Sequence, residues 1–236
     1  KFFEFNLMNK IEKKIIAIGG VGVTPESDES LDRFILNQLK KTKNNIGFLG
    51  TASKDDNEKV EKFYKKFDNS NSELSHFNLT SSVNGFSKWL LGKDLVYVGG
   101  GNTSFMLEIW SKNNFEQVFK IAYEKGIILS GVSAGAVCWF DWILSDSMGQ
   151  GFKPLKGINI LEGSCTPHSS NIERINEFEI NIKNNKLPKG IAIDDGVAVV
   201  FIDGKPTEVY STINNQSAYF LDKNKKINLK EYIKNK

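Results

Sequence analysis

Residues 127–140 have the sequence IILSGVSAGAVCWF, in which a largely apolar run ends at Ser133 and small residues follow. The first six residues have the length and hydrophobicity of one buried strand. The small residues after Ser133 open a helical stretch, which we expect to continue through Phe140. A strand that passes directly into a helix is the repeating unit of parallel sheets covered by helices. This segment therefore predicts an α/β fold.

The same alternation extends in both directions from this segment. Strands are expected at 15–18, 46–50, 74–79 and 95–98, and helices at 30–40, 57–67, 81–91, 103–110 and 114–125. Beyond Lys156 the pattern becomes richer in strands, with 158–161, 190–194, 196–202 and 206–210 around one helix at 172–186. Asp203-Gly204 predicts a hairpin turn. We therefore expect a three-layer α/β sandwich with a mostly parallel central sheet and an antiparallel C-terminal edge.

Length and charge restrict the class of protein. The 236 residues suit one domain with a sizeable core, and we expect that domain to span 8–236. The formal net charge is +3, but six lysines and one glutamate in the last fourteen residues supply +5 of it, since 6 − 1 = 5. Only two arginines occur, so the pattern favours a solvated helical tail over a nucleic-acid-binding surface.

Cysteine, histidine and apolar content exclude several further classes. Two cysteines and two histidines provide neither a disulfide framework nor a convincing zinc site, and we expect no metal or cofactor. The apolar runs are far shorter than a membrane helix, and no signal peptide is visible. We therefore expect a cytoplasmic monomer or homodimer without a membrane partner. Met8 is the expected natural start, which makes residues 1–7 a tail or an appended segment.

Ser133 is the candidate nucleophile. A serine at a sharp strand-to-helix turn needs small neighbours, so that its side chain can stand exposed above the sheet. The N-terminus of the following helix would offer free N–H groups to a developing negative charge. On spacing alone, a tight packing turn with an incidental serine remains an alternative.

The chain resembles peptidase family S51, the serine peptidases that include peptidase E (an aspartyl dipeptidase) and cyanophycinase. The resemblance lies in GGGNT at 99–103, GVSAGA at 131–136, Pro167-His168 and GIAIDDG at 190–196. These motifs follow the order of the family and cover most of the chain from Met8 to about Tyr210. The resemblance implies a fold like that of class I glutamine amidotransferases and a hydrolase that cleaves peptides.

The resemblance also implies catalytic roles. Ser133 would be the nucleophile and His168 its general base, a pairing suited to neutral pH. The backbone N–H of Ala134 would form one half of the oxyanion hole, and Gly100 or Gly101 would supply the other donor. The other histidine, His76, precedes a strand-like stretch and is interpreted as a packing or surface residue.

The family places an acidic residue between the nucleophile and the histidine, where it orients the imidazole. The candidates are Asp141, Asp146 and Glu162. We predict Asp146, because it lies in a polar loop thirteen residues after Ser133. A turn-capping aspartate is the alternative interpretation of Asp146. The adjacent pair Asp194 and Asp195 is a weaker candidate, since paired carboxylates beside a glycine usually form a turn.

The sequence says less about the substrate. We expect Asn102 and Arg174 to bind the substrate. Arg174 lies where the family carries an arginine tied to recognition of aspartate. An arginine on the helix surface, paired with Glu173 or Glu177, remains an equal alternative.

Several other features of the sequence are weaker candidates for a functional site. The glycine run at 19–22 lacks the dinucleotide-binding pattern and is interpreted as a loop on the rim of the active site. Cys138 is expected in the core. Cys165 lies near His168 and could form a catalytic Cys-His pair with it, but Cys165 does not stand at a strand-to-helix turn as Ser133 does.

The expected function is hydrolysis of small peptides through an acyl-enzyme, with Asp-X dipeptides as possible substrates. Three alternatives stay open: a hydrolase of a β-aspartyl-arginine polymer like cyanophycinase, an esterase or amidase on the same turn, and a non-catalytic binding paralogue.

Overall fold

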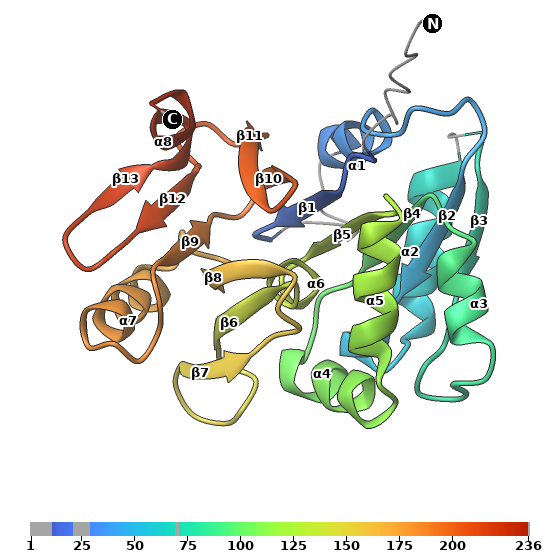
Figure 1. The fold of residues 1–236 in the computed structure, drawn as a ribbon, viewed down its shortest axis with the longest axis horizontal. Coiled ribbons are helices and arrows are strands. Elements are labelled where there is room, and N and C mark those ends of the chain that lie inside the picture. The colour runs from blue at the N-terminus through green and yellow to red at the C-terminus, as the bar shows by residue number, and fades with distance from the viewer. Residues whose placement is uncertain (1–10, 21–28, 69–70, 236) are drawn as a thin grey trace, which may run out of the picture.

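The computed structural model describes residues 11–20, 29–68 and 71–235. The predicted tail at 1–7 lies outside these residues. The described chain forms two sheets that lie side by side in Figure 1. The seven-stranded sheet has the spatial order β11 (Lys205–Ser211), β10 (Val197–Ile202), β1 (Lys14–Ile18), β5 (Ile128–Val132), β4 (Leu95–Val98), β2 (Asn45–Leu49) and β3 (Glu73–His76).

The six-stranded sheet contains the chain that follows the predicted nucleophile. Its spatial order is β13 (Lys226–Asn228), β12 (Ala218–Leu221), β9 (Gly190–Ile193), β8 (Leu161–Thr166), β6 (Phe140–Ser145) and β7 (Lys153–Lys156). Strands β6, β8 and β9 are parallel to one another, and β7 and β12 pair with them in the antiparallel sense. The first sheet is parallel from β1 to β3, with β10 and β11 as its antiparallel edge.

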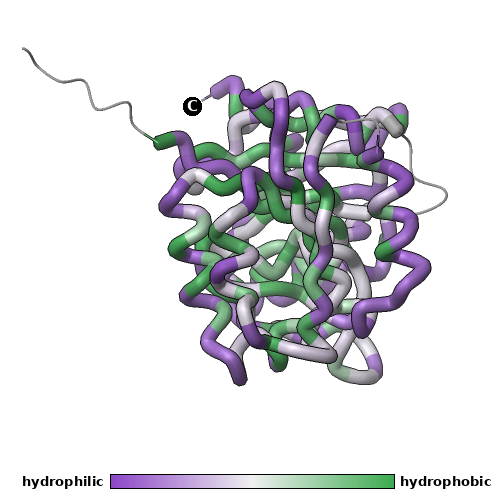
Figure 2. The backbone as a smooth tube through the Cα atoms, turned by 90° about the vertical axis from the view of Figure 1, so that its right-hand side faces the viewer, coloured by the Kyte–Doolittle hydropathy of each residue, from purple (hydrophilic) through white to green (hydrophobic). Residues whose placement is uncertain are grey.

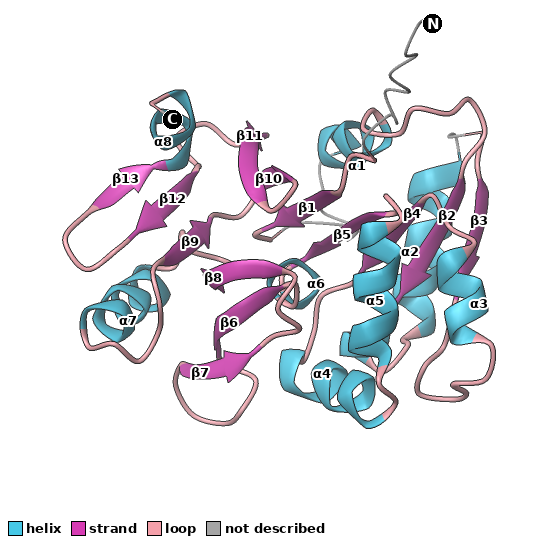
Figure 3. Ribbon diagram, viewed as in Figure 1, coloured by secondary structure: helices cyan, strands magenta, loops and turns pink. Residues whose placement is uncertain are grey.

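Helices cover both faces of the seven-stranded sheet (Figure 3). Helices α1 (Glu29–Leu36) and α2 (Asn57–Phe67) pack on the face that carries Ile16, Phe48 and Tyr97. The other face carries Ile15, Val96 and Leu129, and it is covered by α3 (Phe86–Leu91), α4 (Thr103–Lys112), α5 (Phe115–Glu124) and α6 (Ala134–Val137). Successive residues of a strand point to opposite faces, which is why these neighbouring residues belong to different cores.

The six-stranded sheet shares the second of these cores and has one of its own. Phe140, Ile143 and Cys165 pack into the core beneath α4 to α6. Helix α7 (Ile172–Lys183) packs on the other face of the six-stranded sheet through Phe178 and Ile182. Helix α8 (Leu229–Lys234) is the last helix of the described residues. Figure 2 shows the hydrophobic stretches gathered mainly inside the molecule and the hydrophilic ones mainly outside. No helix in the described part of the chain is long and apolar enough to cross a membrane.

The predicted fold class is confirmed, and the hairpin at Asp203-Gly204 joins β10 to β11 as expected. The C-terminal tail differs in part, because it contributes β13 before its helix, and Leu229 is buried. The helix after Ser133 also differs, because α6 ends at Val137 and the chain turns into β6. The carbonyl groups of Cys138 and Trp139 accept hydrogen bonds from backbone N–H groups at 158–161. The segment 158–161, which was expected to be a separate strand, forms the turn that leads into β8.

Glycines let α6 approach the sheet closely. A Cβ atom on Gly135 would collide with the carbonyl oxygen of Val98, at the end of β4. A Cβ on Gly131 would collide with the carbonyl oxygen of Gly135. Both obstacles are backbone atoms, which cannot rotate away as a side chain can. The position of α6, and of Ser133 before it, therefore depends on the absence of side chains at these two residues.

We predict that Gly135→Ala lowers the free energy of unfolding by about 2–3 kcal/mol, because the added methyl group must displace a backbone strand. The matched control is Gly92→Ala, which has an ordinary φ of −91° and a nearest neighbour at 3.5 Å from the new Cβ. Its effect should stay within about 0.5 kcal/mol. Urea unfolding of the three proteins measures the difference, and equal losses for both variants would contradict the close approach.

Candidate active site

Ser133 lies at the turn between β5 and α6 in a strained backbone conformation. Its φ is 53° and its ψ is −112°, a combination that L-residues rarely adopt. Its backbone N–H donates to the carbonyl of Ile18 at the end of β1, with an N–O distance of 2.9 Å. The turn is therefore fixed by a neighbouring strand, and the serine side chain remains partly exposed.

His168 follows β8 and faces the serine. The Nε2 atom of His168 is 2.9 Å from Ser133 Oγ, so the hydroxyl can donate its hydrogen to the imidazole. The backbone N–H of His168 donates to the carbonyl of Gly19, at 3.2 Å. The end of β1 and the residue after it thus contact both Ser133 and His168. Positions 21–22 of the predicted rim loop lie outside the described residues. The predicted pairing of Ser133 with His168 is present.

Asp195, and not Asp146, is the acid that contacts the imidazole. Asp195 follows β9, and its Oδ1 atom is 2.6 Å from His168 Nδ1. Its other oxygen accepts from the hydroxyl of Ser170 at 2.8 Å. The hydrogen bond from His168 lowers the pKa of Asp195, and the bond from Ser170 adds to this effect against partial burial. Asp195 is therefore ionised at neutral pH and holds the proton of His168 on Nδ1.

The choice of Asp146 as the orienting acid was wrong, because its carboxylate lies against another residue. Asp146 Oδ2 accepts a hydrogen bond from Arg174 Nη2 at 2.6 Å. The other candidates are also placed elsewhere: Asp141 pairs with Lys156, Glu162 is exposed on β8, and Asp194 is buried against Ser169 and Ser217. Asp194 and Asp195 are adjacent, yet only Asp195 reaches the histidine.

The backbone around Ser133 provides candidate oxyanion donors. Ala134 is the first residue of α6, and the first N–H groups of a helix have no partner within it. Gly100 lies directly against the nucleophile, since a Cβ on Gly100 would be 3.3 Å from Ser133 Cβ. Gly101 has a φ of 150° and packs against Ala52, where a side chain would collide with the backbone. Lys59 donates from Nζ to the carbonyl of Gly100 at 3.1 Å.

A cavity of about 250 Å³ opens beside Ser133 and His168. Arg174 and Asp146 line it together with Thr103 and Leu144. The Arg174 side chain is only 7% exposed, and burial lowers its pKa while Asp146 opposes this shift. The helix-surface alternative for Arg174 is therefore wrong, and its guanidinium belongs to the wall of this cavity.

The sequence predicts that Asn102 binds the substrate, but Asn102 is not among the residues that line the cavity. Its Oδ1 caps α4 by accepting from Phe105 N–H at 2.9 Å, and its Nδ2 faces the carbonyl of Ser147 at 3.5 Å. Asn102 therefore caps α4 and contacts the loop that follows β6. Its role in substrate binding stays a prediction.

The remaining candidates have structural surroundings. His76 Nδ1 is 2.9 Å from the hydroxyl of Tyr64, in agreement with a packing role. Cys138 and Cys165 are fully buried, and burial raises the pKa of both thiols, which suppresses the reactive thiolate.

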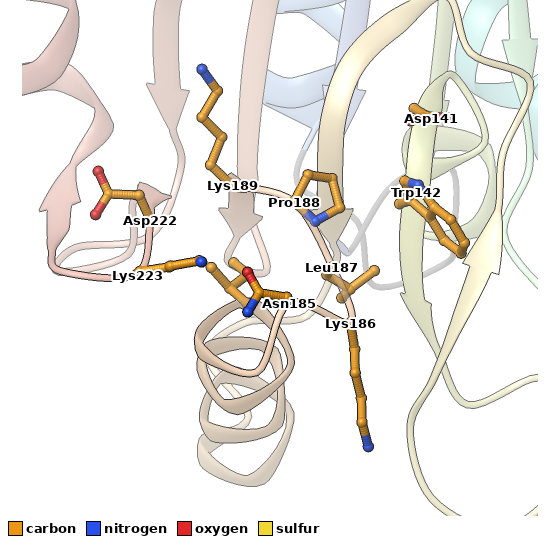
Figure 4. Close-up of a pocket in the computed structure, with 10 residues that line it drawn as sticks. Asp141, Trp142, Asn185, Lys186, Leu187, Pro188, Lys189, Asp222 and Lys223 are labelled. Carbon is orange, nitrogen blue, oxygen red and sulfur yellow. The ribbon is translucent and has the colours of Figure 1, made fainter.

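A larger cavity of about 570 Å³ lies at the other end of the six-stranded sheet (Figure 4). It is lined at the start of β6 by Asp141 and Trp142 and before β9 by Lys186 and Lys189. Ser133, His168 and Asp195 all follow the carboxyl ends of parallel strands, where the smaller cavity opens. Since ligands of open α/β sheets bind at those ends, we assign the chemistry to the smaller cavity.

Comparisons with known proteins give the family of this chain. Residues 15–209 match the family Peptidase family S51. An uncharacterized peptidase, YgaJ of Bacillus subtilis (strain 168), is 36% identical over 210 residues, which cover 88% of this chain and 91% of the relative.

Two solved structures share the fold. A peptidase from an acI-B1 Actinobacterium has a TM-score of 0.67 at 16% identity, covering 93% of this chain and 98% of its own. A putative peptidase E protein from Listeria monocytogenes EGD-e has a TM-score of 0.64 at 15% identity, covering 86% and 100%. The family match spans most of the chain, so this protein belongs to peptidase family S51 and is a hydrolase of the peptidase class.

Proposed function

We propose that the protein is a serine peptidase that hydrolyses short peptides through an acyl-enzyme. The observation that carries the proposal is the continuous chain of hydrogen bonds from Ser133 through His168 to Asp195. A serine hydroxyl is a weak nucleophile until an adjacent base accepts its proton, and a base works best when a third group fixes its tautomer. Both requirements are met, by His168 for the serine and by Asp195 for the histidine.

The steps follow from this geometry. Ser133 Oγ attacks the peptide carbonyl while its proton passes to His168 Nε2, and Asp195 stabilises the resulting imidazolium. The N–H groups of Ala134 and of Gly100 or Gly101 stabilise the oxyanion. His168 then protonates the leaving amine. Water, activated by His168, hydrolyses the acyl-enzyme and restores the serine hydroxyl.

Arg174 makes an N-terminal aspartate one candidate for the residue that enters the cavity. A guanidinium suits recognition of a carboxylate because it has several donors in one plane. Arg174 already contacts Asp146, so an acidic side chain would have to share these donors. A preference for Asp-X is therefore one outcome to be tested against neutral dipeptides.

A hydrolase of a β-aspartyl-arginine polymer is a second candidate, which the family resemblance suggests. The volume of about 250 Å³ favours short peptides over a polymer, because it lies below the range of roughly 300–1,000 Å³ usual for drug-sized ligands. A non-catalytic binding paralogue would have no need for the complete hydrogen-bonded chain from Ser133 to Asp195.

We predict that the purified protein cleaves dipeptides and that Ser133→Ala lowers kcat/KM by at least about 10³-fold, because the attacking oxygen is lost. The panel comprises Asp-X, Ala-X, Leu-X and Gly-X, with released amino acids measured by chromatography. A fluorophosphonate probe should label the wild type and not the variant. A similar thermal midpoint for both proteins shows that only chemistry has changed. Absence of cleavage and of labelling in the folded wild type would reject the peptidase proposal.

We predict that Asp195→Asn lowers kcat by about 10³–10⁴-fold with a small change in KM, because the amide no longer fixes the productive tautomer of His168. Asp141→Asn is the matched control, since Asp141 pairs with Lys156 on the surface and should be dispensable. The rate of fluorophosphonate labelling, followed by mass spectrometry, measures the same step without a peptide substrate. If Asp195→Asn were labelled as fast as the wild type, the proposed role of Asp195 in the mechanism would be rejected.

A further inference from the structure

Asp146 has no role in the hydrogen-bonded chain that activates Ser133, yet its carboxylate lines the same cavity. Its side chain is 62% exposed, whereas that of Arg174 is 7% exposed. Only Oδ2 is bonded to Arg174, and no hydrogen bond to Oδ1 is found among the described residues. Because an ionised carboxylate has about four acceptor positions, Asp146 can still accept a donor from a ligand.

The loop that carries Asp146 is held in place. The hydroxyls of Ser145 and Ser147 are 2.8 Å apart, on either side of Asp146. The backbone N–H of Ser104, in the first turn of α4, donates to Ser147 Oγ at 3.0 Å. Arg174 in turn stacks on Phe152, with 4.6 Å from the guanidinium carbon to the ring centre. The carboxylate is therefore positioned before any substrate arrives, which reduces the entropic cost of binding.

The chemistry of the cavity restricts the ligand that Asp146 can bind. A carboxylate recognises a cation, and a peptide offers either a basic side chain or its terminal α-ammonium. The α-nitrogen of an N-terminal residue lies two bonds from the carbonyl carbon that Ser133 attacks. The group that binds this nitrogen must therefore lie in the same small cavity as Ser133. A basic side chain would extend several carbons further into a space that already holds the Arg174 guanidinium.

We propose that Asp146 is the residue that binds the α-ammonium group of the substrate. This inference rests on the proposed peptidase function and adds the identity of the group that is recognised. Arg174 fixes the carboxylate through Oδ2, and Oδ1 accepts the ammonium. Asp146 is thus a specificity-determining residue and not a part of the proton relay.

The experiment compares the best dipeptide of the panel with its N-acetylated form. The wild type should prefer the free form by at least about 100-fold in kcat/KM. In Asp146→Asn, KM for the free dipeptide should rise by about tenfold or more, and most of the preference should disappear. The side-chain oxygen of asparagine can still accept from Arg174, so we expect this variant to fold. Asp146→Glu should recover part of the preference, and Asp141→Asn, on the strand β6 that precedes Asp146, should retain all of it.

Two results would overturn the inference. One is equal cleavage of the free and acetylated dipeptides by the wild type. The other is an unchanged KM and an intact preference in Asp146→Asn. Fluorophosphonate labelling of Ser133 separates this failure from failure of the proposed function, because the probe has no ammonium group. Normal labelling with an unaltered preference would reject only the role of Asp146. A folded wild type with neither labelling nor dipeptide cleavage would reject the proposed function itself.

A separate observation concerns Lys59, in the first turn of α2. Its Nζ atom donates to the carbonyl of Gly100, and it forms none of the salt bridges found among the described residues. The carbonyl of Gly100 and the N–H of Gly101 belong to one trans peptide group, so they point in opposite directions. A cation on the carbonyl side draws electrons from the amide, which strengthens the N–H as a donor.

We infer that Lys59 is a positioning residue for the oxyanion hole, which acts through the peptide group between Gly100 and Gly101. This inference also depends on the proposed function. Lys59→Met should lower kcat by about tenfold with little change in KM, because a donor that acts on the transition state is weakened and substrate binding is not. Lys59→Arg, which keeps the charge, should retain more activity. Lys62→Met on the same helix is the control, since Lys62 pairs with Glu58 one turn away on the surface of α2.

Measured kcat and KM values for the best dipeptide decide this second inference. An unchanged kcat in Lys59→Met, or an equal loss in Lys62→Met, would overturn it. A loss confined to thermal stability, with normal kcat at low temperature, would make Lys59 a structural residue of α2 and would also overturn it. Labelling of Ser133 by the fluorophosphonate is measured in each variant and in the wild type. Absence of labelling in the folded wild type would reject the peptidase proposal itself, independently of Lys59.

Discussion

The site depends on one constrained peptide turn, in which Ser133 takes a positive φ between β5 and α6. A side chain in this conformation costs about 1–3 kcal/mol unless the surroundings enforce it. Here the enforcement comes from three directions: the hydrogen bond to Ile18 at the end of β1, the absence of a side chain at Gly131, and its absence at Gly135. In this conformation the hydroxyl lies 2.9 Å from His168 Nε2, and Ser133 stands immediately before the first residue of α6.

The second constraint is that the proposed catalytic groups come from both sheets. Ser133 follows β5 of the seven-stranded sheet, whereas His168 and Asp195 follow β8 and β9 of the six-stranded one. Gly20 lies where they meet, since a Cβ there would collide with Asp195 Oδ1 and His168 Nδ1. A parallel bridge between Gly20 and Asp195 joins the two chain segments at this point. The close fit of the two sheets thus sets the distance between nucleophile and base.

These features also explain how far the sequence could predict the site. Ser133 and His168 were predictable because each lies in a short local motif at the end of a strand. Asp195 was only a weaker candidate, because its contact with His168 depends on β9 lying next to β8, and the pairing of these two strands is not visible in the local sequence. The turn residues Asp194-Asp195-Gly196 have the composition of an ordinary loop. The short length of α6 was also hidden, since it is set by hydrogen bonds from 158–161, about twenty residues further along the chain.

The two aspartates illustrate how the surroundings divide chemical roles among identical side chains. Asp195 has both oxygens occupied, by His168 and Ser170, so its charge is committed to the imidazole. Asp146 has one oxygen bound to a buried guanidinium and the other available to a ligand. Exchanging their roles would leave Arg174 unpaired in a partly desolvated cavity, which is costly for a charged group. The two acids thus divide their work: Asp195 serves the proposed proton relay, and Asp146 neutralises Arg174 while one of its oxygens stays available to the proposed ligand cation.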